Sequence, residues 1–178
     1  MKSKPIRLTT TSYALLALLE QLGESTPYEI KAAMEKSLEN FWPVPHTTAY
    51  EEPARLAAAG YLSVRQEEGG RRRKAYSLTE EGRAALAAWA ADTEVSPPQI
   101  RDEMALKFFA GADPATLVPA RTAWHRAKLA ELEGYLDAVR GEDEWRPSEL
   151  TLSAGIGYHR KMLELIEEAQ AAEADGAS

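Results

Sequence analysis

The chain has 178 residues, of which 44% are hydrophobic and 28% are charged, so it can form one large domain or two small ones. It contains no cysteine, which excludes disulfide scaffolds, thiol catalysis and cysteine-ligated metal sites. No run approaches the roughly 18 apolar residues of a membrane span. Glu20 and Gln21 interrupt the apolar run near the N-terminus, so we expect a core helix there rather than a signal peptide, and a cytoplasmic protein.

The charge is unevenly distributed along the chain. The net charge is −7, which for the whole chain argues against binding to nucleic acid. Residues 1–82, however, carry 11 basic and 11 acidic side chains, whereas residues 83–178 carry 10 and 17, so the entire acidic excess lies in the second half. Four of the first half's cations are consecutive, at Arg71, Arg72, Arg73 and Lys74.

Three short helices are predicted in the first 60 residues. Apolar residues at helical spacing indicate a helix over 12–22, and Gly23 ends it. A second helix over 26–38 begins with a capping box formed by Thr26 and Glu29, with Pro27 at its first position. A third helix follows Thr47 or Thr48 and ends at Gly60. This order is typical of a helix-turn-helix.

The pattern then changes to that of a β-hairpin. Residues 61–65 and 72–78 alternate between polar and apolar, with Ala75 or Tyr76 and Leu78 as inward candidates, and Gly69-Gly70 lies between the two runs. A fourth helix is predicted over 80–93. Three helices, a hairpin and a further helix are the order of a winged helix.

Beyond a linker at 95–98, the second half is predicted to be entirely helical, with helices over 99–110, 114–140 and 148–173. Two apolar stripes at alternating steps of 4 and 3 predict helix-on-helix packing, either as an antiparallel hairpin within the chain or as a dimer seam. We therefore expect two domains, a winged helix-turn-helix over 1–95 and a coiled-coil-like helical dimerisation domain over 96–178. The stripes consist of Val118, Thr122, His125, Leu129, Leu132, Leu136 and Val139, and of Leu152, Ile156, His159, Leu163 and Ile166.

The residues best suited to a binding function are candidates for contact with DNA. In a hairpin beside a helix-turn-helix, the guanidinium groups of the basic run Arg71–Lys74 can reach the phosphate backbone or the minor groove, although such a run can also serve only to discourage edge pairing. The third helix would be the recognition helix, with polar groups at its start and one strong cation. These residues are His46, Thr47, Thr48, Tyr50 and Arg55.

Three residues of the third helix argue against DNA binding. Glu51 and Glu52 would be repelled by phosphates, and Pro53 removes one backbone hydrogen bond, which predicts a kink or a late helix start. They motivate an alternative function, that of a winged-helix protein–protein adaptor without DNA binding.

Several short segments, spread over nearly the whole chain, together form a recognisable pattern. They are Tyr13–Leu16, Tyr28–Ile30, Thr48–Tyr50, Arg55-Leu56, Gly60–Leu62, Arg73–Gly82, Trp89, Arg101–Glu103 and Leu106–Phe109. With these segments the chain resembles the PadR family of transcriptional regulators. It departs from the family at Pro53, where we expect a residue compatible with a helix. The resemblance implies a homodimeric repressor with a winged helix, a helical dimerisation domain and an effector, often aromatic, that shifts DNA affinity. Two recognition helices about 34 Å apart predict a palindromic operator.

Four aromatic residues are candidates for an effector pocket, or alternatively for ordinary packing: Trp89, Phe108, Phe109 and Trp124. His125 and His159 lie on the apolar stripes and are expected to be buried packing residues, the alternative being a pH- or metal-sensitive pair. No catalytic motif is present, so we predict no enzyme, no cofactor and no metal. The expected partners are double-stranded DNA, a second copy of the chain and a small effector, and no membrane. As a regulator that binds DNA, the protein is expected to be associated with the bacterial nucleoid.

Overall fold

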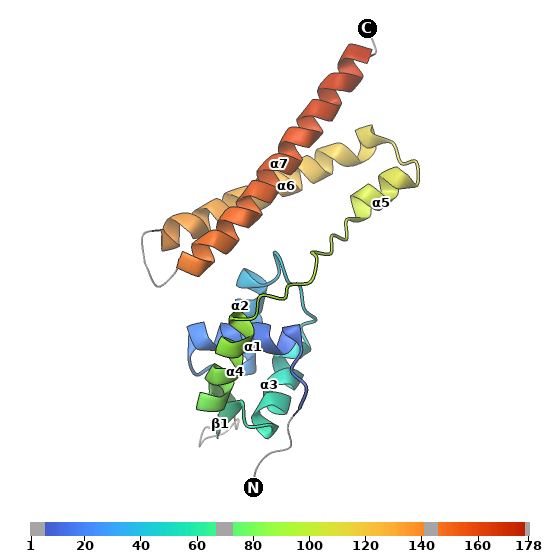
Figure 1. Ribbon diagram of the computed structural model, residues 1–178. Coiled ribbons are helices and arrows are strands. Elements are labelled where there is room, and N and C mark those ends of the chain that lie inside the picture. The colour runs from blue at the N-terminus through green and yellow to red at the C-terminus, as the bar shows by residue number, and fades with distance from the viewer. Residues whose placement is uncertain (1–5, 67–72, 141–145, 177–178) are drawn as a thin grey trace. The chain divides into compact units, whose positions relative to one another are not determined.

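The computed structural model describes residues 6–66, 73–140 and 146–176, and the chain divides into two compact units, Met1–Pro97 and Pro98–Ser178 (Figure 1). The helices of unit 1 that precede the hairpin are α1 (Thr10–Leu22), α2 (Pro27–Ser37) and α3 (Thr48–Ala58). The capping box expected at the start of α2 is present, because the Thr26 hydroxyl accepts from the Glu29 N–H while the Glu29 carboxylate accepts from the Thr26 N–H.

The wing of unit 1 is an antiparallel hairpin of β1 (Leu62–Gln66) and β2 (Lys74–Leu78), in which Leu62 lies opposite Leu78 and Gln66 lies opposite Lys74. Helix α4 (Glu80–Ala90) follows the hairpin, and the Thr79 hydroxyl caps its first turn by accepting from the Gly82 N–H. A backbone bridge between Ser25 and Tyr76 fastens β2 to the turn that connects α1 and α2.

The core of unit 1 is formed mainly by aliphatic side chains of the three helices and the inner face of the hairpin. Both inward candidates of β2, Ala75 and Tyr76, are buried, and the backbone of Tyr76 is also bonded to that of Ser25. The buried cluster consists of Leu15, Leu16, Leu18, Leu19, Ile30, Met34, Ala49, Leu56, Leu62, Tyr76 and Leu78.

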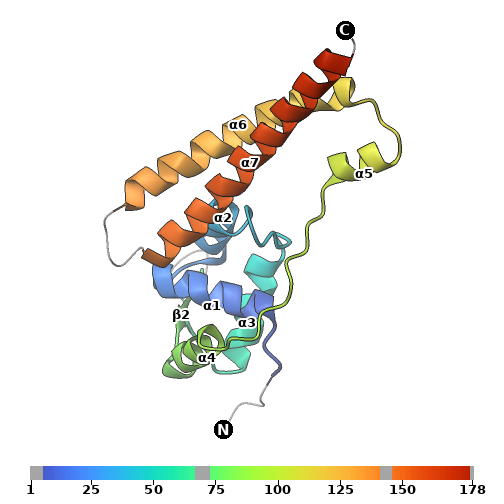
Figure 2. The same ribbon diagram turned by 45° about the horizontal axis from the view of Figure 1, so that its top comes forward.

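Unit 2 contains α5 (Glu103–Phe109), α6 (Pro114–Val139) and α7 (Arg146–Gly176). Helices α6 and α7 pack against each other in antiparallel orientation (Figure 2). The two predicted stripes form their contact, since every residue of both stripes is buried or half-buried. The predicted fold class, mainly helical with a small hairpin and a helical C-terminal half, is therefore confirmed.

The start of α5 differs from the sequence-based prediction, whereas α3 starts where the sequence predicts it. Helix α5 begins at Glu103 rather than at residue 99, because the Asp102 carboxylate accepts from the N–H groups of Met104 and Ala105 and so caps the helix at that point. Helix α3 begins at Thr48, so the late start that Pro53 allowed is not observed.

Candidate nucleic-acid interface

The N-terminal end of α3 presents polar side chains to solvent. Tyr50 is 52% exposed and the side chain of His46 is 65% exposed, while Thr47 is exposed and Thr48 is half-buried. The Thr47 hydroxyl makes no capping hydrogen bond. The backbone N–H groups of Thr48, Ala49 and Tyr50 already donate to preceding carbonyls, so the side chains of this turn are its groups for contacting a ligand. The structure thus brings four of the predicted site residues together at one helix end.

A small charged cluster on α2 adjoins this end of α3. Lys31 Nζ lies 2.6 Å from Glu35 Oε1, and His46 Nδ1 lies 3.5 Å from the same oxygen. The hydrogen bond from Lys31 lowers the pKa of the Glu35 carboxyl, so Glu35 is ionised at neutral pH and Lys31 remains charged.

The described part of the basic run belongs to the hairpin. Arg73 and Lys74 are exposed at the start of β2, whereas Arg71 and Arg72 lie outside the described residues. The Arg73 charge also acts on the beginning of α2. The pKa of the Glu29 carboxyl is lowered by the backbone N–H and the hydroxyl of Thr26, and the Arg73 charge adds to that effect.

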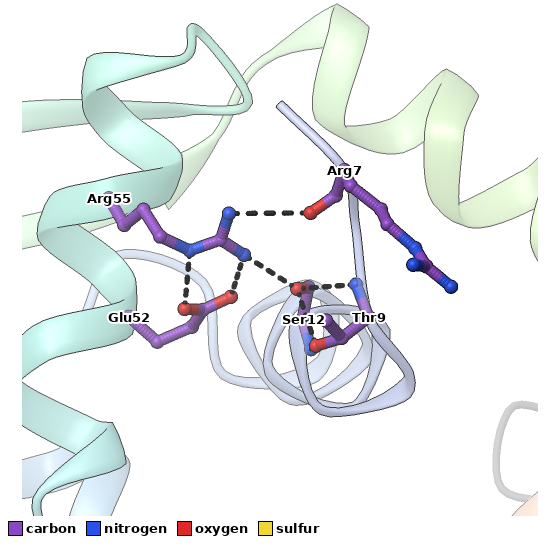
Figure 3. A network of polar contacts seen from close by, with 5 residues as sticks. All are labelled: Arg7, Thr9, Ser12, Glu52 and Arg55. Atoms are coloured by element: carbon purple, nitrogen blue, oxygen red, sulfur yellow. Dashed lines mark hydrogen bonds and ion pairs between the residues drawn. The ribbon is translucent and has the colours of Figure 1, made fainter. Parts of the chain in front are cut away.

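Arg55, the predicted cation of the recognition helix, has its guanidinium group engaged within unit 1 (Figure 3). Its Nε donates to Glu52 Oε2 at 2.8 Å and its Nη2 donates to Glu52 Oε1 at 2.5 Å, a bidentate pair. The hydrogen bonds that Arg55 donates to Glu52 raise the pKa of Arg55. Burial raises the pKa of Glu52, but hydrogen bonds from Arg55 and Ser12 outweigh it and keep the carboxyl ionised. Contact between Arg55 and DNA remains a prediction.

Pro53 packs inward and does not interrupt α3. It is less than 2% exposed and is among the most completely buried side chains of unit 1. Its missing N–H is the one that would have bonded the Ala49 carbonyl in a regular helix. Of the three residues that suggested an adaptor, Pro53 thus belongs to the core and the charge of Glu52 is offset by Arg55, while Glu51 is exposed.

The aromatic candidates for an effector pocket are divided between the two units. Trp89 belongs to unit 1, where it stacks on Tyr13 with ring centroids 4.8 Å apart. Phe108, Phe109 and Trp124 belong to unit 2, in which Phe108 is half-buried and Phe109 is 91% exposed. An effector pocket formed by these residues remains a prediction.

Trp124 lies in a polar cluster that also contains both predicted histidines. The Arg121 guanidinium lies 4.6 Å from the centre of the Trp124 ring and forms an ion pair with Asp102, the capping residue of α5. The Trp124 ring meets His125 and His159 edge to face, and Tyr158 also contacts both histidines. These contacts join α6, α7 and the start of α5.

The two histidines are buried and bonded to each other, since His125 Nδ1 and His159 Nδ1 lie 2.8 Å apart. One nitrogen must donate and the other accept, so the pair cannot hold a proton on both. Burial lowers the pKa of His125 to about 4, with the charges of Arg121 and His159 adding to the effect and Asp102 opposing it. The pKa of His159 is lowered by burial and by the charges of Lys128 and Arg121.

Two further properties of the structure concern metals and membranes. Within residues 6–66, 73–140 and 146–176, no three His, Cys, Asp or Glu side chains come together as metal ligands. In the same part of the chain no helix is long and apolar enough to cross a membrane.

Sequence reasoning missed residues whose partners are distant in the chain. The sequence predicts only that Ser12 begins a helix, yet its hydroxyl accepts from Arg55, 43 positions away. The i, i+3 spacing of Glu52 and Arg55 is a signal that could have predicted their ion pair. Nothing in the local sequence around Asp102 and Arg121 indicates that they meet.

Comparison with known proteins identifies the family. Residues 15–88, from α1 to α4, match the transcriptional regulator PadR-like family, and residues 100–172 match the family described as virulence activator alpha C-term. Residues 15–88 belong to the PadR-like family of transcriptional regulators. The resemblance noted in the sequence is thereby confirmed, and the family is one of regulators rather than enzymes.

Among the relatives of this PadR-like chain is the negative transcriptional regulator PadR of Bacillus subtilis (strain 168), which is 27% identical over 139 residues, or 74% of this chain and 76% of that protein. The crystal structure of B. subtilis PadR in complex with operator DNA matches with a TM-score of 0.78 at 24% identity, covering 92% of this chain and 99% of that chain. The crystal structure of B. subtilis PadR with p-coumaric acid matches with a TM-score of 0.72 at 23% identity, covering 92% of this chain and 98% of that chain. The structure of the Vibrio cholerae virulence activator AphA matches with a TM-score of 0.68 at 22% identity, covering 95% of this chain and 100% of that chain. These proteins share the fold of this chain.

Proposed function

We propose that the protein is a homodimeric, sequence-specific DNA-binding repressor that binds a palindromic operator and releases it when a small aromatic effector binds. One observation carries the proposal: the exposed polar end of α3 and the basic start of β2 occur in the same unit of a PadR-like chain. The existence of a relative crystallised on operator DNA supports it.

The proposed division of labour follows from side-chain chemistry. His46, Thr47, Thr48 and Tyr50 can hydrogen-bond to base edges and phosphates from the start of a helix in the major groove. The hairpin cations, Arg73 and Lys74 in the described part together with Arg71 and Arg72, are proposed to contact phosphates, because guanidinium groups stay charged and donate in a fork. The acidic excess of residues 83–178 is repelled by DNA and favours an approach with unit 1 foremost.

Unit 2 is proposed to form the dimer and to respond to the effector, with residues 1–95 as the DNA-binding domain and 96–178 as the dimerisation domain. Large apolar side chains on its helices are exposed in the single chain, among them Leu106 at 63%, Phe109 at 91% and Leu150 at 75%. Leu106 and Phe109 lie three positions apart on one face of α5, and adjoining exposed apolar side chains are typical of an interface with another protein. A symmetric dimer would place two recognition helices about one DNA turn apart, which predicts the palindrome.

The effector is proposed to be an aromatic molecule bound in part by Trp124, with Trp89, Phe108 and Phe109 as the other candidates. Trp124 is 44% exposed and lies beside the Arg121 guanidinium, so a flat ring carrying a carboxylate finds both a stacking partner and a cation there. p-Coumaric acid has this chemistry and was crystallised with B. subtilis PadR, so it is the first probe to use. Binding would shift the population between dimers that fit the operator and dimers that do not.

Selection from random duplex DNA, followed by salt titration of the winning sequence, tests the proposal. We expect a palindrome whose log affinity falls steeply with log salt, and a shallower slope for R73A/K74A by about 0.9 per lost phosphate contact. R126A is the matched control, because it removes an exposed cation of α6 that pairs with Glu167 at 3.7 Å. It should leave the salt slope unchanged.

The outcomes separate the proposed regulator from the adaptor. If selection enriches no sequence with or without the effector probe, the repressor function is refuted. If a palindrome is enriched but p-coumaric acid and related aromatic acids leave its affinity unchanged, the effector part is wrong and DNA recognition stands. Sedimentation of the free protein as a monomer at micromolar concentration would refute the dimer.

A further inference from the structure

The recognition helix α3 carries an acidic residue, Glu52, with a side chain that is only 15% exposed. A carboxylate beside DNA repels phosphates, so its presence on this helix needs a reason. The structure supplies one, because both carboxylate oxygens of Glu52 accept from Arg55 on the same helix. The pair forms one end of a polar network that reaches another helix (Figure 3).

The other end of the network is the start of α1. Arg55 Nη2 donates to Ser12 Oγ at 2.9 Å, and Arg55 Nη1 donates to the Arg7 carbonyl at 3.4 Å. Ser12 is fully buried, and its hydroxyl and backbone N–H are bonded to Thr9, which caps α1. Arg55 therefore bridges two elements that are 43 positions apart in the chain.

The geometry of the guanidinium group leaves little capacity for a DNA contact. Arginine has five N–H donors, and the structure directs one to each Glu52 oxygen, one to Ser12 and one to the Arg7 carbonyl. One N–H remains, so a bidentate contact with a phosphate would have to displace the Glu52 carboxylate from this group. Since the pair spans α3 and the capped end of α1, its chief mechanical effect is to hold the recognition helix in one orientation.

We infer that Arg55 and Glu52 are positioning residues that fix α3 on α1 for operator recognition and do not themselves touch DNA. This inference rests on the proposed function. Glu52 binds and orients Arg55, and Arg55 carries the connection to Ser12 and Arg7. Loss of either residue lets the start of α3 move relative to the rest of unit 1, which disrupts base contacts more than phosphate contacts.

The decisive experiment compares two variants that remove the same charge from the same helix. E51Q removes an exposed carboxylate, and E52Q removes the carboxylate of the network. If charge alone matters, both variants bind the operator more tightly than wild type, because a repulsion is removed. If Glu52 positions Arg55, only E51Q binds as tightly or more tightly, and E52Q loses about tenfold in operator affinity, which corresponds to the coupling between hydrogen-bonded neighbours.

Two further readouts separate positioning from general loss of stability. Binding is measured at a temperature at which circular dichroism shows each variant fully folded. Affinity for random duplex DNA and the salt slope should be those of wild type for both E52Q and R55A, whereas R73A should have a shallower slope. R55K tests the bidentate geometry of the guanidinium group. Lysine keeps the charge but cannot form the bidentate pair, so the R55K variant should lose operator preference as E52Q does.

The results that overturn the inference are distinct from those that overturn the proposed function. E52Q binding the operator as tightly as E51Q refutes positioning by Glu52. If the salt slope of R55A is shallower than that of wild type by about 0.9, the change expected for one lost phosphate contact, then Arg55 touches a phosphate and the inference is also refuted. If wild-type protein prefers no DNA sequence at all, the proposed function fails and the inference fails with it.

Discussion

Replacing Gly82 with alanine should destabilise unit 1, although alanine is the better helix former. Gly82 lies in the first turn of α4, where that helix passes the start of the wing. A Cβ atom at this position would lie 2.2 Å from the Tyr61 carbonyl oxygen and 3.2 Å from its carbon. The oxygen belongs to the backbone, so it cannot turn aside as the end of a side chain can. It also accepts from the Thr79 N–H at 3.2 Å, which holds it in place.

The change in the free energy of unfolding is the sum of one stabilising and two destabilising contributions. Alanine in place of glycine stabilises a helix by up to about 1 kcal/mol. Forcing an extra methyl group into a packed site costs about 1–3 kcal/mol. Displacing the Tyr61 carbonyl weakens its hydrogen bond from Thr79, at a cost of about 1 kcal/mol. The net effect is a loss of about 2 kcal/mol in the free energy of unfolding, which for a chain of this size lowers Tm by roughly 4–8 °C.

Thermal and guanidinium unfolding of the full chain measure this effect, and amide hydrogen exchange shows where it acts. We expect the Thr79 N–H of G82A to exchange faster than in wild type, because its acceptor has moved. The matched control is G134A in α6, where a Cβ would meet no atom within 4 Å. That variant should gain about 0.5–1 kcal/mol from helix propensity alone.

A single result would refute this reasoning. If G82A is as stable as wild type and the protection of the Thr79 N–H is unchanged, then the approach of α4 to Tyr61 is not a constraint. The gain expected for G134A would then show that the assay itself resolves changes of this size.

Two further predictions concern stability. The folded state lowers the pKa of His125 from 6.5 to about 4, so its neutral form stabilises the fold above pH 6.5 and this stabilisation is lost as pH falls toward 4. Urea midpoints should thus decrease by an amount equivalent to about 2 kcal/mol between pH 7 and pH 5, and a smaller decrease is expected for H125N; equal decreases would exclude the histidine as the cause. T26A removes the reciprocal cap of α2 and should cost about 1 kcal/mol, with T26S retaining most of it, as denaturant unfolding can check.

Features that depend on neighbours in the chain could be predicted from the sequence. The capping box of Thr26 and Glu29 joins residues three positions apart, so their types and spacing suffice to predict it. The stripes containing His125 and His159 were predicted because the helical period places their members on one face, and that face is buried as expected. The recognisable Arg73–Gly82 segment likewise led to the family that the comparisons confirm.

Contacts between distant segments were decided only by the tertiary structure. The stripes allowed either a hairpin or a dimer seam, and the packing of α6 on α7 shows that they meet within one chain. The bond between His125 and His159 joins residues 34 positions apart, and that between Ser12 and Arg55 joins residues 43 apart. Local sequence limits which backbone conformations are accessible, but it does not specify which of two distant helix faces will meet. That choice depends on packing the whole chain at once, and it places Arg55, which the sequence offers only as a cation of the recognition helix, in a link between two helices.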